Sequence, residues 1–145
     1  MIAIQKAKPK DLPVLAELAC QLWPHHELTE MQADLAEIMK KEAAFFLAFA
    51  ESVAIGFAQC QLRRDYVEGT ESTPVGYLEG IYVTEGYRKQ GIARALLQAC
   101  EGWAKEQGCR EFASDCELTN LESLKFHLNV GFEEANRIIC FAKKI

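Results

Sequence analysis

Hydrophobic and polar positions alternate, or recur at helical spacing, in an order that predicts a mixed α/β domain. Residues 2–5 alternate as a short strand, and apolar positions at helical spacing then predict helices over 11–24 and 29–39. Residues 45–50 form a continuous apolar run typical of a buried strand, and residues 53–63 alternate as the next strand, which fades toward its end. The first half of the chain therefore predicts the order β-α-α-β-β.

The second half continues with strands and helices in alternation. Residues 77–83 are aromatic and β-branched and predict a strand. Residues 92–105 place apolar side chains on one helical face and charged ones on the other. Residues 112–116 predict another strand, and residues 119–131 predict a helix that opens with a Thr-x-x-Glu capping pattern and closes at a glycine.

The end of the chain and one long loop complete the pattern. Phe132 and the apolar run 138–142 predict one or two final strands. Residues 64–74 form the longest loop-like stretch, which is acidic, and long ordered loops in small domains are often functional. No repeat, low-complexity tract or linker interrupts the sequence, so residues 1–145 are expected to form a single domain.

Composition narrows the class of protein. Half of the residues are hydrophobic and 26% are charged, which is ordinary for a soluble globular protein. The net charge of −5 argues against nucleic acid as a partner and leaves room for a cationic ligand. No apolar run approaches the roughly 20 residues of a membrane helix, and the N-terminus lacks the layout of a signal peptide. We therefore expect no membrane association and a cytoplasmic protein.

The cysteines fit the same compartment. None of the six stands in a C-x-x-C pair or at metal-ligand spacing, so no metal is expected. Most lie in apolar patterns, which favours buried free thiols in a reducing cytoplasm. They are Cys20, Cys60, Cys100, Cys109, Cys116 and Cys140.

The turn between residues 83 and 92 predicts an anion site. It joins a strand to a helix start, where unpaired backbone N–H groups and the helix dipole favour negative charge. Gly86 and Gly91 have the spacing of a P-loop, but Ile92 and Ala93 stand where that motif needs Lys and Ser or Thr. No G-x-G-x-x-G is present, which argues against a dinucleotide. The alternative is an ordinary strand–helix turn with a basic first helical turn.

Charged and aromatic residues mark a second candidate region. Glu79 and Asp115 are charges inside predicted strands, where a carboxylate needs a partner or a function. Their alternative is the exposed face of an edge strand. Trp23 stands at a helix end before two histidines, with a packed Trp and solvated histidines as the alternative, and Tyr66 lies in the acidic loop, where it could be a loop anchor.

Two motifs carry a resemblance to the GNAT acetyltransferases. The turn Arg88-x-x-Gly91-x-Ala93 resembles the R/Q-x-x-G-x-G/A turn with which that family grips the pyrophosphate of acetyl-coenzyme A. The stretch from Asn120 to Phe132 is similar to the family's N-x-x-A-x-x-x-Y-x-x-x-G-F segment. The resemblance implies the GNAT fold, an α/β (α+β) arrangement with a central mixed, mostly antiparallel sheet flanked by about four helices.

Two positions depart from that pattern. His127 stands where many members carry the Tyr that protonates the leaving thiolate, and Ser123 stands where Ala is usual. The proton donor therefore stays open between Tyr82, His127 and water.

Shorter segments narrow the resemblance to the chromosomal-type aminoglycoside 6'-N-acetyltransferases. These segments are 22–24, 65–67, 78–81, 108–111 and 113–115, and the similarity covers essentially the whole chain. The resemblance implies a homodimer and a drug site lined by Trp23, His26, Tyr66, Glu79 and Asp115. It implies coenzyme contacts from Ile81, Tyr82, Val83, Arg88, Lys89, Gln90, Gly91, Ile92, Ala93, Arg94 and Asn120. Asn136 replaces a Glu that is frequent in the group, so a substrate contact there is open.

The predicted reaction is acetyl transfer from acetyl-coenzyme A to the 6'-amine of an aminoglycoside, with antibiotic resistance as its effect. An aminoglycoside carries several ammonium groups, so carboxylates and aromatic faces suit its site. Glu79 is the first choice for the base that takes the ammonium proton, because strand alternation places it on the face of Ile81, and Asp115 is the second. No cysteine has a clear activating neighbour, which favours direct attack in a ternary complex.

Two other functions remain open at this stage. The first is a GNAT enzyme for another small amine, such as a polyamine. The second is a non-catalytic acyl-coenzyme A sensor, which would keep the turn at Arg88–Ala93 and lose the acidic residues. The presence of Glu79 and Asp115 argues against the sensor.

Overall fold

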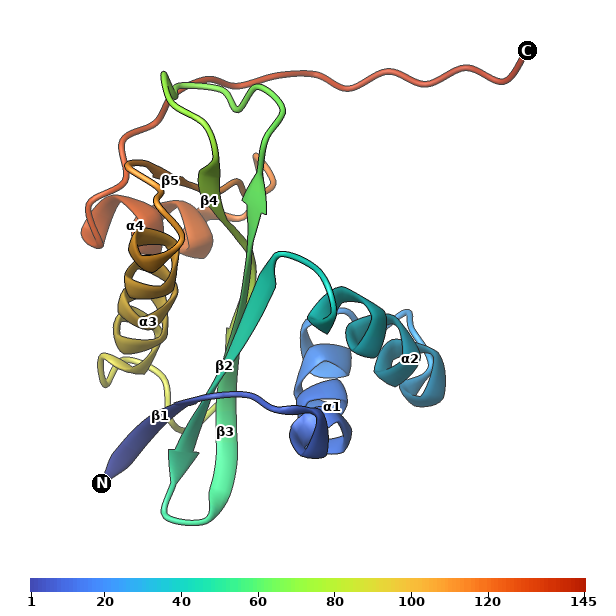
Figure 1. Cartoon of the computed structure of the whole chain (residues 1–145), viewed down its shortest axis with the longest axis vertical. Coiled ribbons are helices and arrows are strands. Elements are labelled where there is room, and N and C mark those ends of the chain that lie inside the picture. Colours follow the sequence, from blue (N-terminus) through green and yellow to red (C-terminus); the bar gives the residue numbers. More distant parts are fainter.

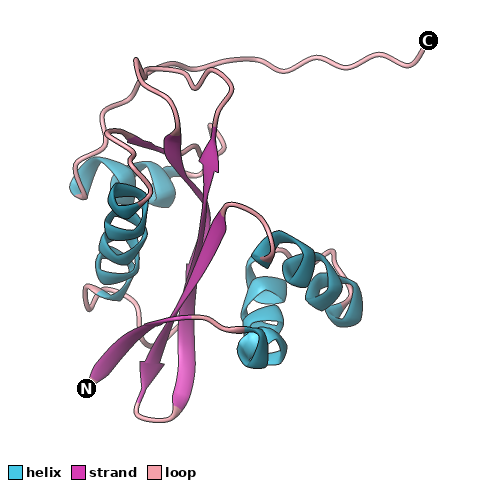
Figure 2. Cartoon of the chain, in the orientation of Figure 1, coloured by secondary structure: helices cyan, strands magenta, loops and turns pink.

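The computed structural model describes residues 1–145 and consists of a central sheet with helices on both faces (Figure 1, Figure 2). Strand order in the sheet follows the chain, β1-β2-β3-β4-β5. All neighbours are antiparallel except β4 and β5, which are parallel. The elements are β1 (Ile2–Lys6), η1 (Pro9–Asp11), α1 (Leu12–Leu22), α2 (Leu28–Met39), β2 (Ala43–Ala50), β3 (Val53–Arg63), β4 (Val75–Val83), α3 (Ile92–Glu106), β5 (Phe112–Ala113) and α4 (Leu121–Asn129).

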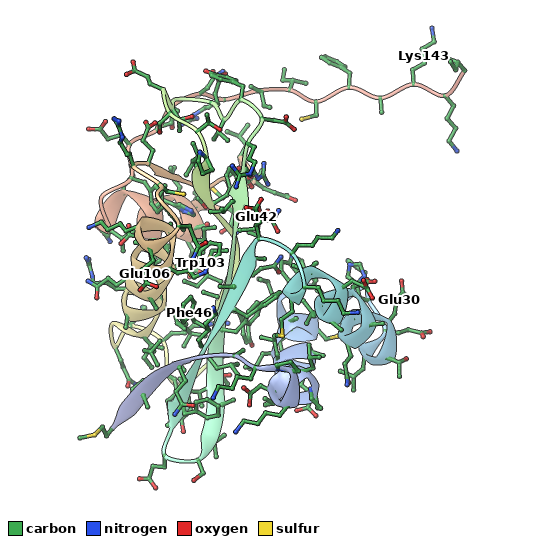
Figure 3. All side chains as sticks on the ribbon, in the orientation of Figure 1. Glu30, Glu42, Phe46, Trp103, Glu106 and Lys143 are labelled. Atoms are coloured by element: carbon green, nitrogen blue, oxygen red, sulfur yellow. The ribbon has the colours of Figure 1, made fainter.

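Each face of the sheet has its own hydrophobic layer. One layer lies under α3 and includes Leu96, Leu97 and Trp103, with Phe46 packed at its margin (Figure 3). The other lies under α1 and α2 and includes Leu15, Leu35 and other buried side chains. Because successive strand residues point to opposite faces, the central strands feed both layers, which explains their nearly continuous apolar sequence. No helix in the structure is both long and apolar enough to cross a membrane.

The strands β4 and β5 separate soon after they meet. They pair only at Gly76 with Phe112 and at Tyr77 with Ala113, whereas β4 continues to Val83. The edge of β4 from Leu78 to Val83 therefore has no strand beside it on this side. An unpaired strand edge presents backbone N–H and C=O groups that an extended ligand can bind.

A β-bulge in β4 lies at Glu79. Gln59 pairs with Gly80 and the next residue of β3, Cys60, pairs with Leu78, so Glu79 has no partner in the ladder. A bulge adds one residue and resets the alternation of side chains beyond it. Leu78 and Ile81 thus both pack in the layer under α3.

The bulge corrects one prediction from the alternation, that Glu79 and Ile81 share a face. Leu62 packs under α3, so its neighbour Arg63, to which Glu79 bonds, lies on the opposite face. Gly80 faces the Trp23 ring, also away from α3. Glu79 and Gly80 therefore point to one side consecutively, and Ile81 points to the other.

The predicted strand at 112–116 is shorter than expected, and the final strands over 132–142 are absent. β5 ends at Ala113, and no backbone hydrogen bond extends beyond Phe132, whose N–H donates to the carbonyl of His127. The last residues run away from the folded body as an extended tail, with Lys143 near its far end (Figure 3). The physical reason is that a strand needs a neighbouring strand to satisfy its backbone, and this chain provides none at that place.

Two further expectations need correction. The helix expected from a Thr119–Glu122 capping pattern begins instead after Asn120, whose side chain accepts a hydrogen bond from the Ser123 N–H at 3.1 Å. All six cysteines are free, but only Cys60, Cys100 and Cys109 are buried. Cys20 is half-buried, and Cys116 and Cys140 are exposed because they lie in segments that do not form the predicted strands.

Candidate active site

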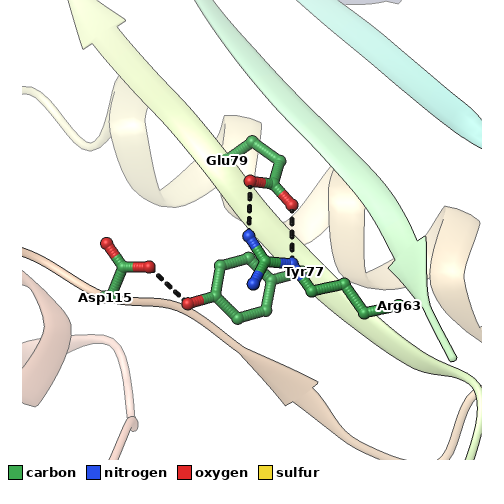
Figure 4. Close-up of polar contacts among 4 residues, drawn as sticks. All are labelled: Arg63, Tyr77, Glu79 and Asp115. Carbon is green, nitrogen blue, oxygen red and sulfur yellow. Dashed lines mark hydrogen bonds and ion pairs between the residues drawn. The ribbon is translucent and has the colours of Figure 1, made fainter. Parts of the chain in front are cut away.

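Glu79 is bound by an arginine that the sequence did not single out. Arg63, the last residue of β3, donates from Nε to Oε2 of Glu79 at 3.0 Å and from Nη2 to Oε1 at 2.9 Å (Figure 4). The guanidinium carbon lies 3.4 Å from the centre of the Tyr77 ring. This two-point geometry matches the planar fork of guanidinium to carboxylate, and the hydrogen bonds to Glu79 raise the pKa of Arg63.

Tyr77 connects this pair to the second candidate carboxylate. Its hydroxyl donates a short hydrogen bond to Oδ2 of Asp115, which follows β5 (Figure 4). Burial, and then this hydrogen bond, raise the pKa of Tyr77 well above its ordinary value. Tyr77 therefore stays protonated and holds Asp115 in place. We call Arg63, Tyr77, Glu79 and Asp115 the acidic cluster; it contains two carboxylates and one guanidinium.

Trp23 closes one side of this region. It caps the C-terminal end of α1, and its ring meets that of Phe57 edge-on with centroids 6.0 Å apart. A Cβ added at Gly80 would lie 2.6 Å from Cη2 of Trp23, so the indole ring covers the backbone next to Glu79. The structure thus places Trp23 beside the acidic cluster, partly buried against the core edge.

The other two predicted drug contacts stand apart from the cluster. Tyr66 is 78% exposed, and its hydroxyl donates to Glu68 at 3.1 Å. Asn136 donates to the other oxygen of Glu68 at 2.8 Å, which ties the start of the tail to this loop. His26 is exposed, and its side chain makes no hydrogen bond.

The N-terminal end of α3 fits the predicted anion site. Gly91 is the N-cap residue with a left-handed backbone (φ 81°, ψ 8°), and no side chain caps the helix. The first N–H groups of this 15-residue helix are therefore free to bind an anion. Lys89 also has a positive φ of 63°, an uncommon conformation for a residue with a side chain.

Three side chains around this turn already make hydrogen bonds within the protein. Arg88 donates from Nε to the carbonyl of Val83 at 2.7 Å, so it braces the end of β4. Arg94 donates to the carbonyl of Asn129 at 3.1 Å and joins the start of α3 to the end of α4. Gln90 bonds the carbonyl of Gly86 at 3.4 Å. The backbone N–H groups, Lys89 and the other guanidinium N–H groups of Arg88 and Arg94 remain uncommitted donors here.

The imidazole of His127 is held by hydrogen bonds at both of its ring nitrogens. Its Nδ1 lies 2.7 Å from the carbonyl oxygen of Ser123, and its Nε2 lies 2.7 Å from Oγ of Ser114. A carbonyl only accepts, so Nδ1 carries the proton and Nε2 of the neutral ring accepts from the Ser114 hydroxyl. The ring also contacts Phe126 and Phe132, with centroids 5.7 and 5.1 Å away.

Glu111 anchors the acidic loop, which is a second contact that the sequence did not reveal. Its Oε1 accepts hydrogen bonds from the backbone N–H groups of Glu71 and Ser72, both at 2.9 Å, and from the Ser72 hydroxyl. These bonds lower the pKa of Glu111. Arg63, Tyr77 and Glu111 were missed because their partners lie far away in sequence; an arginine that ends an apolar strand was the only signal for Arg63.

The structure contains no group of three or more His, Cys, Asp and Glu side chains placed to hold a metal ion. The chemistry available here consists of two carboxylates near aromatic faces, an open strand edge and an uncapped helix N-terminus. Together they suit a cationic ligand beside an extended ligand that carries phosphate.

Sequence comparison finds a matching family and similar proteins. Residues 12–132 match the profile of the Acetyltransferase (GNAT) family. The chain is 45% identical over 125 residues, 86% of each protein, to "Aminoglycoside N(6')-acetyltransferase type 1" of Salmonella typhimurium (strain LT2). It is 43% identical over 141 residues to the protein of the same name from Stenotrophomonas maltophilia, covering 95% of this chain and 90% of that one.

Solved structures agree with these sequence matches. AAC(6')-Iy in complex with the bisubstrate analog CoA-S-monomethyl-acetylneamine aligns with a TM-score of 0.95 at 40% identity, over 100% of this chain and 99% of that one. AAC(6')-Ih from Acinetobacter baumannii aligns with a TM-score of 0.91 at 38% identity, over 100% of this chain and 99% of that one.

Proposed function

This chain belongs to the GNAT family of acetyltransferases, and on that premise we propose that it transfers the acetyl group of acetyl-coenzyme A to the 6'-amine of an aminoglycoside. The observation that carries the proposal is the acidic cluster beside Trp23, where two carboxylates lie together with aromatic rings, an arrangement that suits a cationic ligand. Residues 1–145 act as one catalytic domain in this view. Acetylation of the drug in the cytoplasm would confer antibiotic resistance, and the six free cysteines fit a reducing compartment.

The residues present fit acetyl-coenzyme A. The free N–H groups that follow Gly91 at the start of α3 suit the pyrophosphate, with Lys89 as a nearby cation. The backbone of Ile81, Tyr82 and Val83 lies on the unpaired edge of β4 and suits the extended pantetheine arm. Asn120 uses its side-chain oxygen to cap α4, which leaves its amide NH₂ group for the coenzyme.

The amine substrate is assigned to the acidic cluster and its surroundings. Glu79 and Asp115 attract ammonium groups, and the rings of Trp23 and Tyr66 offer apolar or cation–π contact. We assign to His26, which is exposed after the end of α1, a polar contact at the margin of this site.

Glu79 is our candidate for the base. The ammonium must lose a proton before its nitrogen lone pair can attack the thioester carbonyl, and a carboxylate can take that proton directly or through water. Asp115, which accepts a hydrogen bond from the Tyr77 hydroxyl, is the second candidate. The acetyl group then passes to the nitrogen, and the coenzyme leaves as a thiolate that needs a proton.

The geometry of His127 disfavours it as the direct donor of that proton. In the neutral ring the only N–H points to the Ser123 carbonyl, and Nε2 is an acceptor. Tyr82 and water remain as donors.

We also propose that the enzyme is a homodimer held partly by its tail. Large apolar side chains project from the tail into solvent: Ile138, Ile139, Phe141 and Ile145. Ile139 and Phe141 are 80% and 91% exposed, which is costly in a monomer and is relieved if the tail adds a strand to a second copy. Light scattering should give a dimer for the full chain and a monomer for a chain that stops at Asn136.

An amine panel tests the proposed reaction. Purified protein is mixed with acetyl-coenzyme A and with kanamycin, neamine, spermidine or a peptide with a free N-terminus, and thiol release is measured. Turnover with the aminoglycosides and acetylation at the 6'-amine by mass spectrometry support the proposal. Turnover with spermidine alone would make the chain a polyamine enzyme, and coenzyme binding without turnover would make it a sensor.

A further inference from the structure

We propose that Arg63 is an internal cation that occupies Glu79 in the substrate-free enzyme and is displaced when a substrate ammonium binds. The inference rests on the proposed function, because it concerns how the same site receives its amine. It makes Arg63 a residue that determines specificity, since a substrate must replace a guanidinium to reach the carboxylate.

The first argument is the state of Glu79. Each of its two carboxylate oxygens accepts a hydrogen bond from Arg63, at 2.9 and 3.0 Å. A carboxylate engaged in this two-point pair has its most exposed lone pairs occupied and cannot take a proton from an ammonium at the same position. Base catalysis by Glu79 therefore requires that Arg63 moves or gives up at least one of these bonds.

The second argument is that Arg63 can move. Its side chain is 40% exposed, whereas that of Glu79 is 16% exposed, so the cation lies over the carboxylate on the solvent side. Glu79 is the only hydrogen-bond partner of its side chain, and the guanidinium stacks on the face of Tyr77. Arg63 is also the last residue of β3, followed by the loop to β4, so its side chain is attached at the end of the strand.

The third argument is charge. The acidic cluster holds two carboxylates and one guanidinium, so it carries a net charge of −1 while Arg63 is in place. Withdrawal of Arg63 leaves −2 for the substrate, which suits an acceptor with more than one ammonium group. A neutral or singly charged amine gains less from this exchange, so the arrangement selects for polycations.

The competing interpretation is that Arg63 permanently positions Glu79. It predicts that removal of Arg63 harms the enzyme instead of tightening substrate binding. If Arg63 stays on Glu79 in the complex, its removal disorders the base and lowers kcat. If Arg63 competes with the substrate, its removal frees Glu79 and tightens binding. We therefore use Arg63→Met, which keeps an apolar stem against Tyr77 and removes the charge, and Arg63→Lys, which keeps a charge without the two-point pair.

The binding experiment uses the protein with coenzyme A and titrates kanamycin in a calorimeter. We expect Arg63→Met to bind kanamycin about fivefold more tightly than the wild type, as removal of one competing ion pair of this kind implies, with Arg63→Lys in between. The KM for kanamycin should fall in the same order. Weaker binding together with a lower kcat in Arg63→Met, rescued by Arg63→Lys, would overturn the proposal.

A second measurement does not depend on turnover. In the free protein with ¹⁵N-labelled arginine, the Nε–H signal of Arg63 should be identifiable by its loss in Arg63→Met and should show slow exchange with water. Saturating kanamycin should shift it to the position of a solvated arginine. An unchanged signal at saturation contradicts displacement even if the drug is acetylated. If no aminoglycoside is acetylated, the proposed function fails by itself, and spermidine serves as the displacing cation; no shift with either amine overturns the inference.

Discussion

The indole of Trp23 lies directly on the backbone of Gly80, with Cη2 and Cζ2 at 2.6 and 2.7 Å from where a Cβ would stand. No side chain fits between them, so Gly80 lets α1 approach the strand that carries Glu79. The contact ties the end of the first helix to the residue next to the candidate base.

Gly80→Ala should therefore disturb the amine site more than the coenzyme site. The new methyl group must push Trp23 away, which we expect to cost about 1–3 kcal/mol of unfolding free energy and to raise the KM for kanamycin. Binding of acetyl-coenzyme A should be little changed. Gly102→Ala is the matched control: Gly102 lies inside α3 with nothing within 4 Å of its Cβ position, so alanine should stabilise the protein by about 0.5–1 kcal/mol. An equal KM for kanamycin in the two variants would show that Trp23 is not part of the amine site.

Gly91→Asp tests the assignment of the pyrophosphate. The residue has a φ of +81°, which strains any side chain, and an aspartate there also brings a negative charge to the start of α3. Gly91→Asn carries the same strain and nearly the same shape without the charge. We expect calorimetry to show coenzyme binding abolished by Asp and only weakened by Asn. Identical affinities of the two variants for the coenzyme would contradict the assignment of an anion site at the start of α3.

Glu79→Gln tests the base. The amide keeps the size but cannot take the proton, so turnover of kanamycin should fall by about 10²-fold, the lower end of what a positioned base contributes. One hydrogen bond from Arg63 is lost as well, so we also expect the affinity for kanamycin to change. The decisive measurement separates turnover from binding: loss of a base lowers kcat at saturating drug, whereas loss of a binding charge alone raises the KM. Full turnover at saturating drug would leave Glu79 as a binding residue and make Asp115 the leading base.

Tyr66→Ala and Trp23→Ala separate binding from packing. Tyr66 is 78% exposed, so its loss should leave the melting temperature unchanged. Because its ring is assigned to the amine site, the same change should raise the KM for kanamycin. Trp23 also packs on Phe57, and its truncation should cost about 3 kcal/mol of stability besides raising the KM. Neither change should alter the KM for acetyl-coenzyme A, because both remove contacts on the amine side. Parallel increases in both KM values would make these aromatic residues structural.

The pH dependence of the acidic loop follows from Glu111. Its pKa in the folded protein is below the ordinary 4.5 because Ser72 and the Glu71 N–H bond its charged form. A depressed carboxyl pKa gives stability that is present above 4.5 and lost as the pH falls through the folded value. Amide exchange at Glu71 and Ser72 should therefore accelerate as the pH falls below 4.5, after correction for the intrinsic exchange rate.

Glu111→Gln should show that acceleration already at neutral pH. Glu106→Gln is its control, because Glu106 is exposed and makes no hydrogen bond or ion pair. Slow exchange at Ser72 in the Glu111 variant would mean that other contacts hold the loop.

The parts of the fold set by local sequence could be predicted. The turn and helix from Arg88 onward follow from apolar spacing over one helix and from glycines where the backbone turns. Glu79 and Asp115 stood out because a charge within an apolar strand is unusual. Arg63 could not be assigned to Glu79, because the two are 16 positions apart and their meeting depends on strand register and on the bulge.

The wrong predictions also concern features that depend on pairing between distant strands. The apolar run at 138–142 shows that a strand is possible, but a strand is defined by its partner, and composition contains no information about the edge it will join. The expected shared face of Glu79 and Ile81 failed because a bulge is a property of the pairing between two strands and leaves no mark in one of them.

The bulge determines which single-residue deletions in β4 the sheet tolerates. Because Glu79 is the residue without a ladder partner, a chain that lacked it would restore regular pairing of β3 with β4 and keep Tyr77 and Gly80 on one face. Deletion of Gly80 would restore the same pairing, but it would put the Glu79 side chain in the place of Gly80, against the Trp23 ring, so deletion of Glu79 is the milder change for folding. The sheet does not need this residue for its own construction, so the position is open to selection on chemistry alone.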